Sequence, residues 1–272
     1  MLGLAVLAYA AVLWCFQARF IYVPQATPPA EATVALAMGA ERLVFPVAGV
    51  AQVAWLLAPR PDAPRVLWVL CIGNGGCATM WLQQPSFLVP SLWRRTGAAF
   101  VAIDNPGSGE NPGSPSPATI LAMSQAAQAA ALARLGWKRS EVRVAVLGMS
   151  LGTGPAAQHA VAEAADRLAL ISPYTALIDL AQRTQPWPFW HLLHHRFDVR
   201  AGVRAVAARP GGMIQIYHGD ADQTIPIEMS RELAALAPHA ARLREVSGAG
   251  HEDVLTKVLA QAIDDLAAPF PP

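Results

Sequence analysis

One short stretch places a serine between two glycines at a spacing that suits nucleophilic catalysis. Gly148-Met149-Ser150-Leu151-Gly152 has the form G-x-S-x-G, and it lies between an apolar run and a segment rich in small residues. In a sharp turn from a strand into a helix, this pattern exposes the serine hydroxyl, and glycines keep the two elements from being crowded. The alternative is an ordinary strand-to-helix turn that carries no chemistry.

A serine hydroxyl is a weak nucleophile and needs a neighbouring base. Among the seven histidines our candidate is His251, because it follows the last predicted strand in Gly248-Ala249-Gly250-His251. His218 also ends a predicted strand, but it precedes the turn that carries the nearest acids. We therefore interpret His218 and the remaining histidines as structural residues.

The base needs a carboxylate that fixes its tautomer and stabilises the imidazolium ion. Asp220 and Asp222 both follow the penultimate predicted strand, and their positions alone leave the choice between them open. Asp179 is a more distant candidate. Asp253 is close to His251 in sequence, but we expect it to be the N-cap of the closing helix.

Acyl transfer also requires two hydrogen-bond donors for the oxyanion. One expected donor is the backbone N–H of Leu151, directly after the serine. The other is expected in the loop Gly73-Asn74-Gly75-Gly76, at the backbone N–H of Asn74. A glycine-rich loop also suits phosphate, but the chain contains no G-x-G-x-x-G or Walker pattern.

These candidates share one place in the predicted fold. Apolar runs alternate with helical segments from residue 41 onward, which indicates a parallel sheet covered on both faces. Catalytic groups at the carboxyl ends of parallel strands meet at one edge of the sheet. The predicted strands span residues 43–47, 50–57, 66–72, 98–103, 142–147, 168–171, 213–217 and 243–246. The predicted helices span residues 87–95, 119–135, 154–165, 227–236 and 253–266.

Composition excludes several classes of protein. The chain has 20 basic and 19 acidic residues, and this balance does not indicate a nucleic-acid binder. Charged residues make up 14% of the chain, below the usual 25% or so, which indicates a buried sheet, a membrane contact or both. Cys15, Cys71 and Cys77 have no regular spacing, so we expect neither a disulfide framework nor a zinc site.

The first 23 residues form an apolar run interrupted only by Gln17 and Arg19. A helix of this length reaches roughly 35 Å, enough for a hydrocarbon core of about 30 Å. We predict an uncleaved single-pass membrane anchor at residues 1–23, a linker at 24–40 and one catalytic domain at 41–272. The alternatives are a signal peptide and a buried N-terminal helix packed on the domain. The side of the membrane stays open, and we expect a chain that begins near Glu31 to fold without the helix.

With these residues in place, the chain resembles the α/β-hydrolase superfamily, in particular its small membrane-anchored hydrolases of the serine-aminopeptidase-like or lysophospholipase-like branch. The order Ser150, Asp222, His251 is the nucleophile–acid–base order of that superfamily. The resemblance covers residues 20–266. The matching segments are Phe20-Ile21-Tyr22-Val23-Pro24, Ile72-Gly73-Asn74-Gly75-Gly76, residues 104–111, the serine turn, Ser172-Pro173-Tyr174, residues 218–226 and residues 250–253.

This resemblance implies an eight-stranded, mostly parallel sheet whose second strand is antiparallel. It also favours Asp222 as the acid and His251 as the base. Ile72 stands where the family usually has a histidine that braces the oxyanion loop, so the loop must be held differently. Asn105-Pro106 replaces a Tyr-Arg pair, which puts any contact from that arginine in doubt.

The interval between the sixth and seventh strands is too short for a full lid domain. We expect it to form an aromatic flap in which Trp187, Phe189 and Trp190 line the substrate pocket, with ordinary helix packing as the alternative. The resemblance implies a serine hydrolase of esters or thioesters with an apolar acyl group, which needs no metal or organic cofactor. Its expected partners are a small-molecule substrate and, through the N-terminal helix, a lipid bilayer. The alternatives are amide hydrolysis, acyl transfer, or a non-catalytic binding protein.

Overall fold

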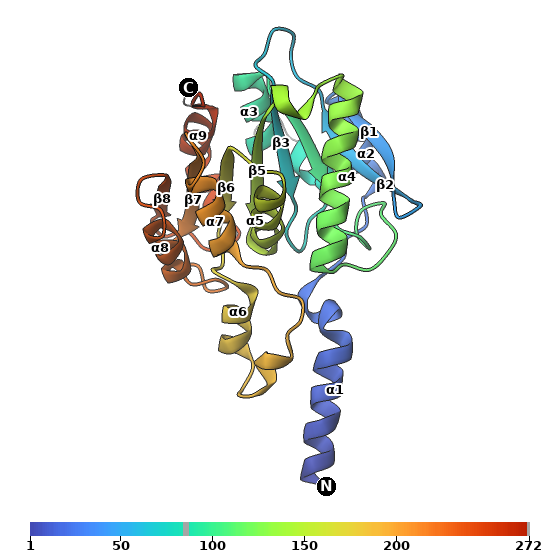
Figure 1. Cartoon of the computed structure of the whole chain (residues 1–272), viewed down its shortest axis with the longest axis vertical. Coiled ribbons are helices and arrows are strands. Elements are labelled where there is room, and N and C mark those ends of the chain that lie inside the picture. Colours follow the sequence, from blue (N-terminus) through green and yellow to red (C-terminus); the bar gives the residue numbers. More distant parts are fainter. Residues whose placement is uncertain (84–86, 271–272) are drawn as a thin grey trace.

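The computed structural model describes residues 1–83 and 87–270, and its centre is one twisted sheet (Figure 1). Within these residues eight strands pair in the order β1-β2-β4-β3-β5-β6-β7-β8. They are β1 (Ala40–Val47), β2 (Val50–Leu57), β3 (Val66–Cys71), β4 (Ala99–Ile103), β5 (Arg143–Met149), β6 (Arg167–Ile171), β7 (Met213–Gly219) and β8 (Ala241–Val246).

The direction of the strands confirms the predicted fold class. Strand β2 runs antiparallel to both of its neighbours, with Val44 opposite Val53 and Leu56 opposite Val101. Strands β3 to β8 pair in parallel. The carboxyl ends of β3, β5, β7 and β8 therefore lie at the same edge, and each is followed by one of the predicted catalytic loops.

Helices cover both faces of the sheet, as the uninterrupted apolar strands require. Alternate residues of β3 show this, because Leu67 and Val69 belong to one buried cluster and Trp68 and Leu70 to the other. Helices α4 (Pro117–Leu135), α5 (Thr153–Ala162), α7 (Val199–Ala207) and α8 (Ile227–Ala235) pack on the first face. Helices α2 (Pro29–Ala37), α3 (Leu88–Thr96) and α9 (Val254–Ala267) pack on the second.

The predicted elements are all present with ends shifted by a few residues, but the structure contains helices that the sequence analysis missed. These are α2 and two elements of the expected flap, α6 (Leu177–Thr184) and α7. The interval between β6 and β7 also contains a short 3₁₀ helix, η4 (Phe189–Leu192). It forms no large lid domain over the sheet.

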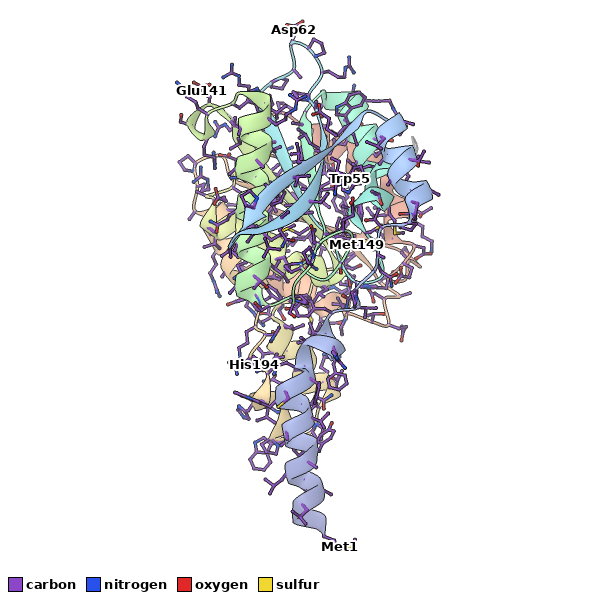
Figure 2. The ribbon with its side chains drawn as sticks, turned by 90° about the vertical axis from the view of Figure 1, so that its right-hand side faces the viewer. Met1, Trp55, Asp62, Glu141, Met149 and His194 are labelled. Carbon is purple, nitrogen blue, oxygen red and sulfur yellow. The ribbon has the colours of Figure 1, made fainter. Side chains whose placement is uncertain are left out.

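Helix α1 (Leu2–Ile21) projects from the globular part of the molecule (Figures 1 and 2). It is long and apolar enough to cross a membrane, and only 6% of its candidate span is buried. The alternative of a helix packed into the core is therefore wrong for most of its length. The remaining assignments, an anchor or a signal sequence, share this geometry.

The last turns of α1 are nevertheless attached to the domain. Tyr22, just after the helix, is 4% exposed and belongs to the main buried cluster. Gln17 is also buried, and its side-chain oxygen accepts hydrogen bonds from the backbone N–H groups of His194 and His195 at 2.9 and 3.0 Å. Residues 29–37 of the predicted linker form α2, and its Ala35 is buried.

This attachment bears on truncation. A chain that begins near Glu31 would lack Tyr22 and so leave a gap in the core, against the expectation stated above. A chain that begins at Gln17 keeps every N-terminal side chain that the domain buries. The useful boundary for a shortened protein therefore lies near the start of the last turn of α1.

Asp104, directly after β4, carries a buried carboxyl group whose titration should affect the stability of the fold. Burial raises its pKa to about 7; the hydrogen bond from the Ala78 N–H opposes this rise, and the nearby charges of Glu110 and Glu31 add to it. In the unfolded chain the same carboxyl has its ordinary pKa of 3.8. Between these two values the folded protein keeps a proton that the unfolded chain has lost, so the stabilisation that this proton provides is lost as the pH rises toward 7.

We therefore expect Asp104→Asn to change the pH dependence of stability. From pH 5 to pH 8 the free energy of unfolding of the wild type should fall relative to that of the variant, by roughly 3 kcal/mol, because two pKa units correspond to this value. Urea unfolding of both proteins at several pH values measures the difference. A wild-type-minus-variant difference that stays constant with pH would contradict a raised pKa at Asp104.

Candidate active site

Ser150 lies on a strained turn between β5 and α5. Its φ of +52° is in the left-handed region, which a residue with a side chain rarely occupies. Gly148 and Gly152 leave no room for side chains: a Cβ at Gly148 would lie 2.7 Å from the Cβ of Ala156, and one at Gly152 would collide with the carbonyl of Cys71. The turn has the close-packed geometry that the G-x-S-x-G pattern predicts.

His251 and Asp222 reach this serine from two neighbouring loops. The Nε2 atom of His251 lies 2.8 Å from Oγ of Ser150, and its Nδ1 atom lies 2.7 Å from Oδ2 of Asp222. An ionised carboxylate only accepts hydrogen bonds, so Nδ1 carries the proton and Nε2 is free to accept the serine proton. The structure thus joins the three residues by a continuous chain of hydrogen bonds.

Asp222 is held in an environment that keeps it ionised. Its side chain is fully buried, and burial alone raises the pKa of a carboxyl. The hydrogen bonds from His218 and His251 and from the backbone N–H groups of Ile225 and Thr224 outweigh that effect and hold the pKa of Asp222 below its usual value. A permanent charge at this position can fix the orientation of His251.

His218 contributes to this environment. It is completely buried, and its Nε2 atom lies 2.8 Å from the carbonyl oxygen of Ile225 and 3.2 Å from Oδ2 of Asp222. Since a carbonyl oxygen only accepts, Nε2 carries the proton and is shared with the carboxylate. The structural role that we inferred for His218 therefore includes a contact with Asp222, the residue that is hydrogen-bonded to His251.

The other acidic candidates lie in different contacts. Asp220 accepts a hydrogen bond from the backbone N–H of Gly248, which ties its turn to the loop that carries His251. Asp179 pairs with Arg200 at 2.7 Å. Asp253 is at the N-cap position of α9, but its carboxylate accepts from the N–H of Gly250 and pairs with the side chain of Lys257 at 2.8 Å, not with a backbone N–H of the helix.

The loop at residues 73–77, here called the oxyanion loop, lies directly against the serine turn. A Cβ at Gly73 would be 2.6 Å from the carbonyl oxygen of Met149 and 3.5 Å from Cβ of Ser150. The next residue in the loop is Asn74, and Leu151 is the middle residue of the short 3₁₀ helix η3 (Ser150–Gly152). The loop that carries one expected donor residue therefore lies against the turn that carries the other.

An apolar cavity of about 430 Å³ opens beside the serine and histidine loops. Its lining includes Met149 and Glu252, the chain neighbours of Ser150 and His251. The rest of its wall comes from the segment after the oxyanion loop, from the start of α3 and from α9. These residues are Met80, Trp81, Phe87, Leu88, Leu255, Thr256 and Leu259. This wall was not predicted from the sequence, although Leu255 and Leu259 stand four residues apart on one face of a predicted helix.

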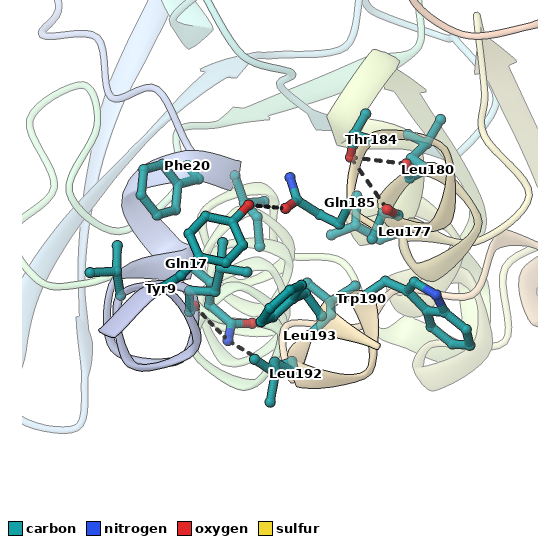
Figure 3. A pocket seen from close by; sticks show the side chains of 15 residues that line it. Tyr9, Gln17, Phe20, Leu177, Leu180, Thr184, Gln185, Trp190, Leu192 and Leu193 are labelled. Atoms are coloured by element: carbon teal, nitrogen blue, oxygen red, sulfur yellow. Dashed lines mark hydrogen bonds between the residues drawn. The ribbon is translucent and has the colours of Figure 1, made fainter. Parts of the chain in front are cut away.

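The aromatic flap lies elsewhere. Phe189 and Trp190 line a second apolar cavity, of about 420 Å³, between α1, α6 and η4 (Figure 3). Tyr9 of α1 closes one side of this cavity through a hydrogen bond of 2.7 Å to the side chain of Gln185. Trp187 is 77% exposed and does not line either cavity. Phe189 and Trp190 thus line the cavity against the N-terminal helix, whereas other residues form the cavity beside the triad.

Comparisons with known proteins agree with this architecture. No protein-family model matches the chain. An uncharacterised protein of Mycobacterium tuberculosis, recorded in two strains, is 28% identical over 247 residues, which cover 89% of this chain and 82% of that protein.

Solved structures show the same fold at low sequence identity. An esterase of Pyrococcus furiosus is 14% identical, with a TM-score of 0.66 over 90% of this chain and 94% of that one. A thermophilic esterase of Thermogutta terrifontis is 22% identical, with a TM-score of 0.56 over 84% and 90%. An α/β serine hydrolase without a lid, from Xanthomonas campestris, is 16% identical, with a TM-score of 0.52 over 86% and 96%.

All three structures have the same overall architecture as this chain. The one from Xanthomonas campestris also lacks a lid. The eight strands and the antiparallel second strand were predicted from the resemblance, and the helices on both faces from the apolar runs; all are present here. The chain therefore has the α/β-hydrolase fold.

Proposed function

We propose that the protein is a serine hydrolase that cleaves a carboxylic ester or thioester with an apolar acyl group. The observation that carries this proposal is the hydrogen-bonded chain from Ser150 through His251 to Asp222, at 2.8 and 2.7 Å. Three residues from separate loops meet in the order that activates a serine, at the sheet edge where this fold binds ligands. The names of the similar structures, two esterases and a serine hydrolase, support the same reaction class.

In the first half of the proposed reaction, His251 accepts the proton of Ser150 while Oγ attacks the carbonyl carbon. The tetrahedral oxyanion is stabilised by the backbone N–H groups of Leu151 and Asn74. His251 then donates its proton to the leaving group, and the acyl group stays on Ser150 as an ester. A water molecule, deprotonated by His251, hydrolyses this ester and restores the serine.

The acyl group is expected in the cavity beside the triad. Its walls are mainly apolar side chains, and Met149 joins it directly to the nucleophile. The same triad could cleave an amide or pass the acyl group to another acceptor, and a comparison of ester, thioester and amide substrates separates these reactions. A non-catalytic binding protein would fail to react with a fluorophosphonate probe, which labels only an activated serine.

We further propose that α1 anchors the enzyme in a membrane. Leu4, Leu7 and Phe16 are examples of large apolar side chains on this helix that face solvent in the absence of a bilayer. The oxyanion loop touches the end of α1, so the catalytic edge of the sheet faces the side from which the helix projects. An apolar substrate held in a bilayer would approach from that side.

The triad assignment predicts a sharp ranking of variants. Ser150→Ala and His251→Ala should each lower kcat by roughly 10⁴-fold or more, and the double variant should lose little more because the residues act together. Asp222→Asn should lower kcat by about 10³- to 10⁴-fold. Asp220→Asn is the matched control and should stay within threefold of the wild type. Hydrolysis of a p-nitrophenyl ester measures all five variants, and full activity in Ser150→Ala would refute the mechanism.

The acyl cavity predicts a change in chain-length preference. Leu255→Trp should fill part of the cavity and lower kcat/KM for long-chain esters by about 15-fold, if two methylenes worth about 0.8 kcal/mol each lose their site. Activity on an acetate ester should change little. Leu180→Trp in the cavity against α1 is the control of equal size. A chain-length effect in Leu180→Trp but not in Leu255→Trp would assign the acyl group to the flap instead.

If α1 is an anchor, its removal should change the binding of the protein to membranes and leave its hydrolytic activity on soluble esters unchanged. The full-length protein should sediment with membranes, whereas a chain of residues 17–272 should stay in the supernatant, because it lacks most of the exposed apolar helix. Both should hydrolyse a short soluble ester at rates within about twofold. Sedimentation of the shortened chain with membranes, or release of the full-length protein by high salt, would count against α1 as the anchor.

A further inference from the structure

We propose that residues 21–31 of the N-terminal segment brace the oxyanion loop from its outer side and so position the oxyanion hole. The inference deepens the proposed function and rests on it. It concerns positioning residues, because none of these N-terminal side chains is expected to touch the reacting atoms. Two separate contacts carry it, one at the centre of the loop and one at its end.

The first contact joins Asn74 to the end of α1. Its side-chain Oδ1 accepts a hydrogen bond from the N–H of Val23 at 3.0 Å, and its Nδ2 donates to the carbonyl of Ile21 at 2.7 Å. Carbonyl groups in the last turn of a helix have no partner within the helix, so Ile21 is available to accept. The two bonds use both ends of the carboxamide and fix the orientation of the residue whose backbone N–H is the proposed oxyanion donor.

The second contact joins Glu31 of α2 to the end of the loop. Its Oε2 atom lies 3.1 Å from Sγ of Cys77 and 3.1 Å from Oγ1 of Thr79. Both partners are buried. Burial and the neighbouring Glu31 carboxylate raise the pKa of the Cys77 thiol, while its contact with Thr79 lowers it; the net shift is upward, so the thiol stays protonated and can donate to Glu31.

The loop needs these contacts because its own inner residues offer no polar brace. Ile72, which stands where a bracing histidine was expected, is buried in the apolar core. On the inner side Gly73 rests against the carbonyl of Met149 without a side chain between them. In the part of the chain that the structure describes, the side-chain hydrogen bonds of Asn74 are those to Ile21 and Val23. Since a displacement of about 1 Å can lower an enzymatic rate by about 100-fold, the outer contacts are placed to matter for catalysis.

The first test is Asn74→Ala in the full-length protein. This substitution keeps the backbone N–H and removes both bonds to α1. We expect kcat on a soluble ester to fall about tenfold with KM within twofold, because the loss concerns the transition state and not the bound ester. The affinity for an arylboronic acid, which forms a tetrahedral anion on the serine, should fall by the same factor. Because Asn74 is exposed, the melting temperature should stay close to that of the wild type.

The second test uses a matched pair at Glu31. Glu31→Ala removes the acceptor for the thiol and the hydroxyl, whereas Glu31→Gln keeps a side-chain oxygen that can accept. Cys77 and Thr79 also contact each other at 3.1 Å, so they keep one partner in either variant. We expect Glu31→Ala to lower kcat and boronate affinity together by several-fold, and Glu31→Gln to restore both.

The outcomes separate the brace from the proposed function. Unchanged kcat and boronate affinity in both alanine variants would overturn the brace, as would a loss that follows only the melting temperature and spares boronate affinity. A wild-type protein that neither hydrolyses esters nor reacts with a fluorophosphonate would instead refute the hydrolase itself. Parallel losses in kcat and boronate affinity, with rescue by Glu31→Gln, support the brace.

Discussion

The close packing of the serine turn is the constraint on which the rest of the site depends. Ser150 occupies a left-handed backbone conformation at the point where β5 meets α5, and the glycines on either side lie against backbone atoms of neighbouring segments. The turn can keep this conformation only while β3 and α5 hold it on both sides. The same packing brings the oxyanion loop against the serine, because Gly73 and Gly152 both approach backbone across the β3–β5 boundary.

The second requirement of the site is a buried, ionised carboxylate at Asp222. Hydrogen bonds from the surrounding residues replace the hydration that this carboxylate loses on burial. Asp222 has lost its contact with water, yet two imidazoles and two backbone N–H groups replace those lost hydrogen bonds. The orientation of His251 follows from this arrangement, since its Nδ1–H has a fixed acceptor. Asp220 and Asp253 hold the two loops that bear the acid and the base, through the N–H groups of Gly248 and Gly250.

The N-terminal region is more closely integrated with the domain than an anchor and a linker would be. Most of α1 is exposed, but Gln17 and Tyr22 are buried, and the chain between Ile21 and Glu31 contacts the oxyanion loop. The surface that would meet a bilayer and the edge of the sheet that carries the triad therefore lie on the same side. This arrangement makes the helix part of the structure around the proposed active site, in addition to any role in localisation.

The sequence by itself determined the sheet, its parallel direction and the loops that hold Ser150, Asp222 and His251, because apolar runs and turn residues are local signals that do not depend on distant contacts. It could not locate the cavity beside the triad, because Leu255, Phe87 and Met149 come from three distant segments whose side chains meet only after the helices pack. For the same reason it did not predict helix α2 within the segment expected to be a linker. Only the tertiary structure decided how the oxyanion loop is held, since the bonds from Asn74 to Ile21 and Val23 join residues about fifty positions apart.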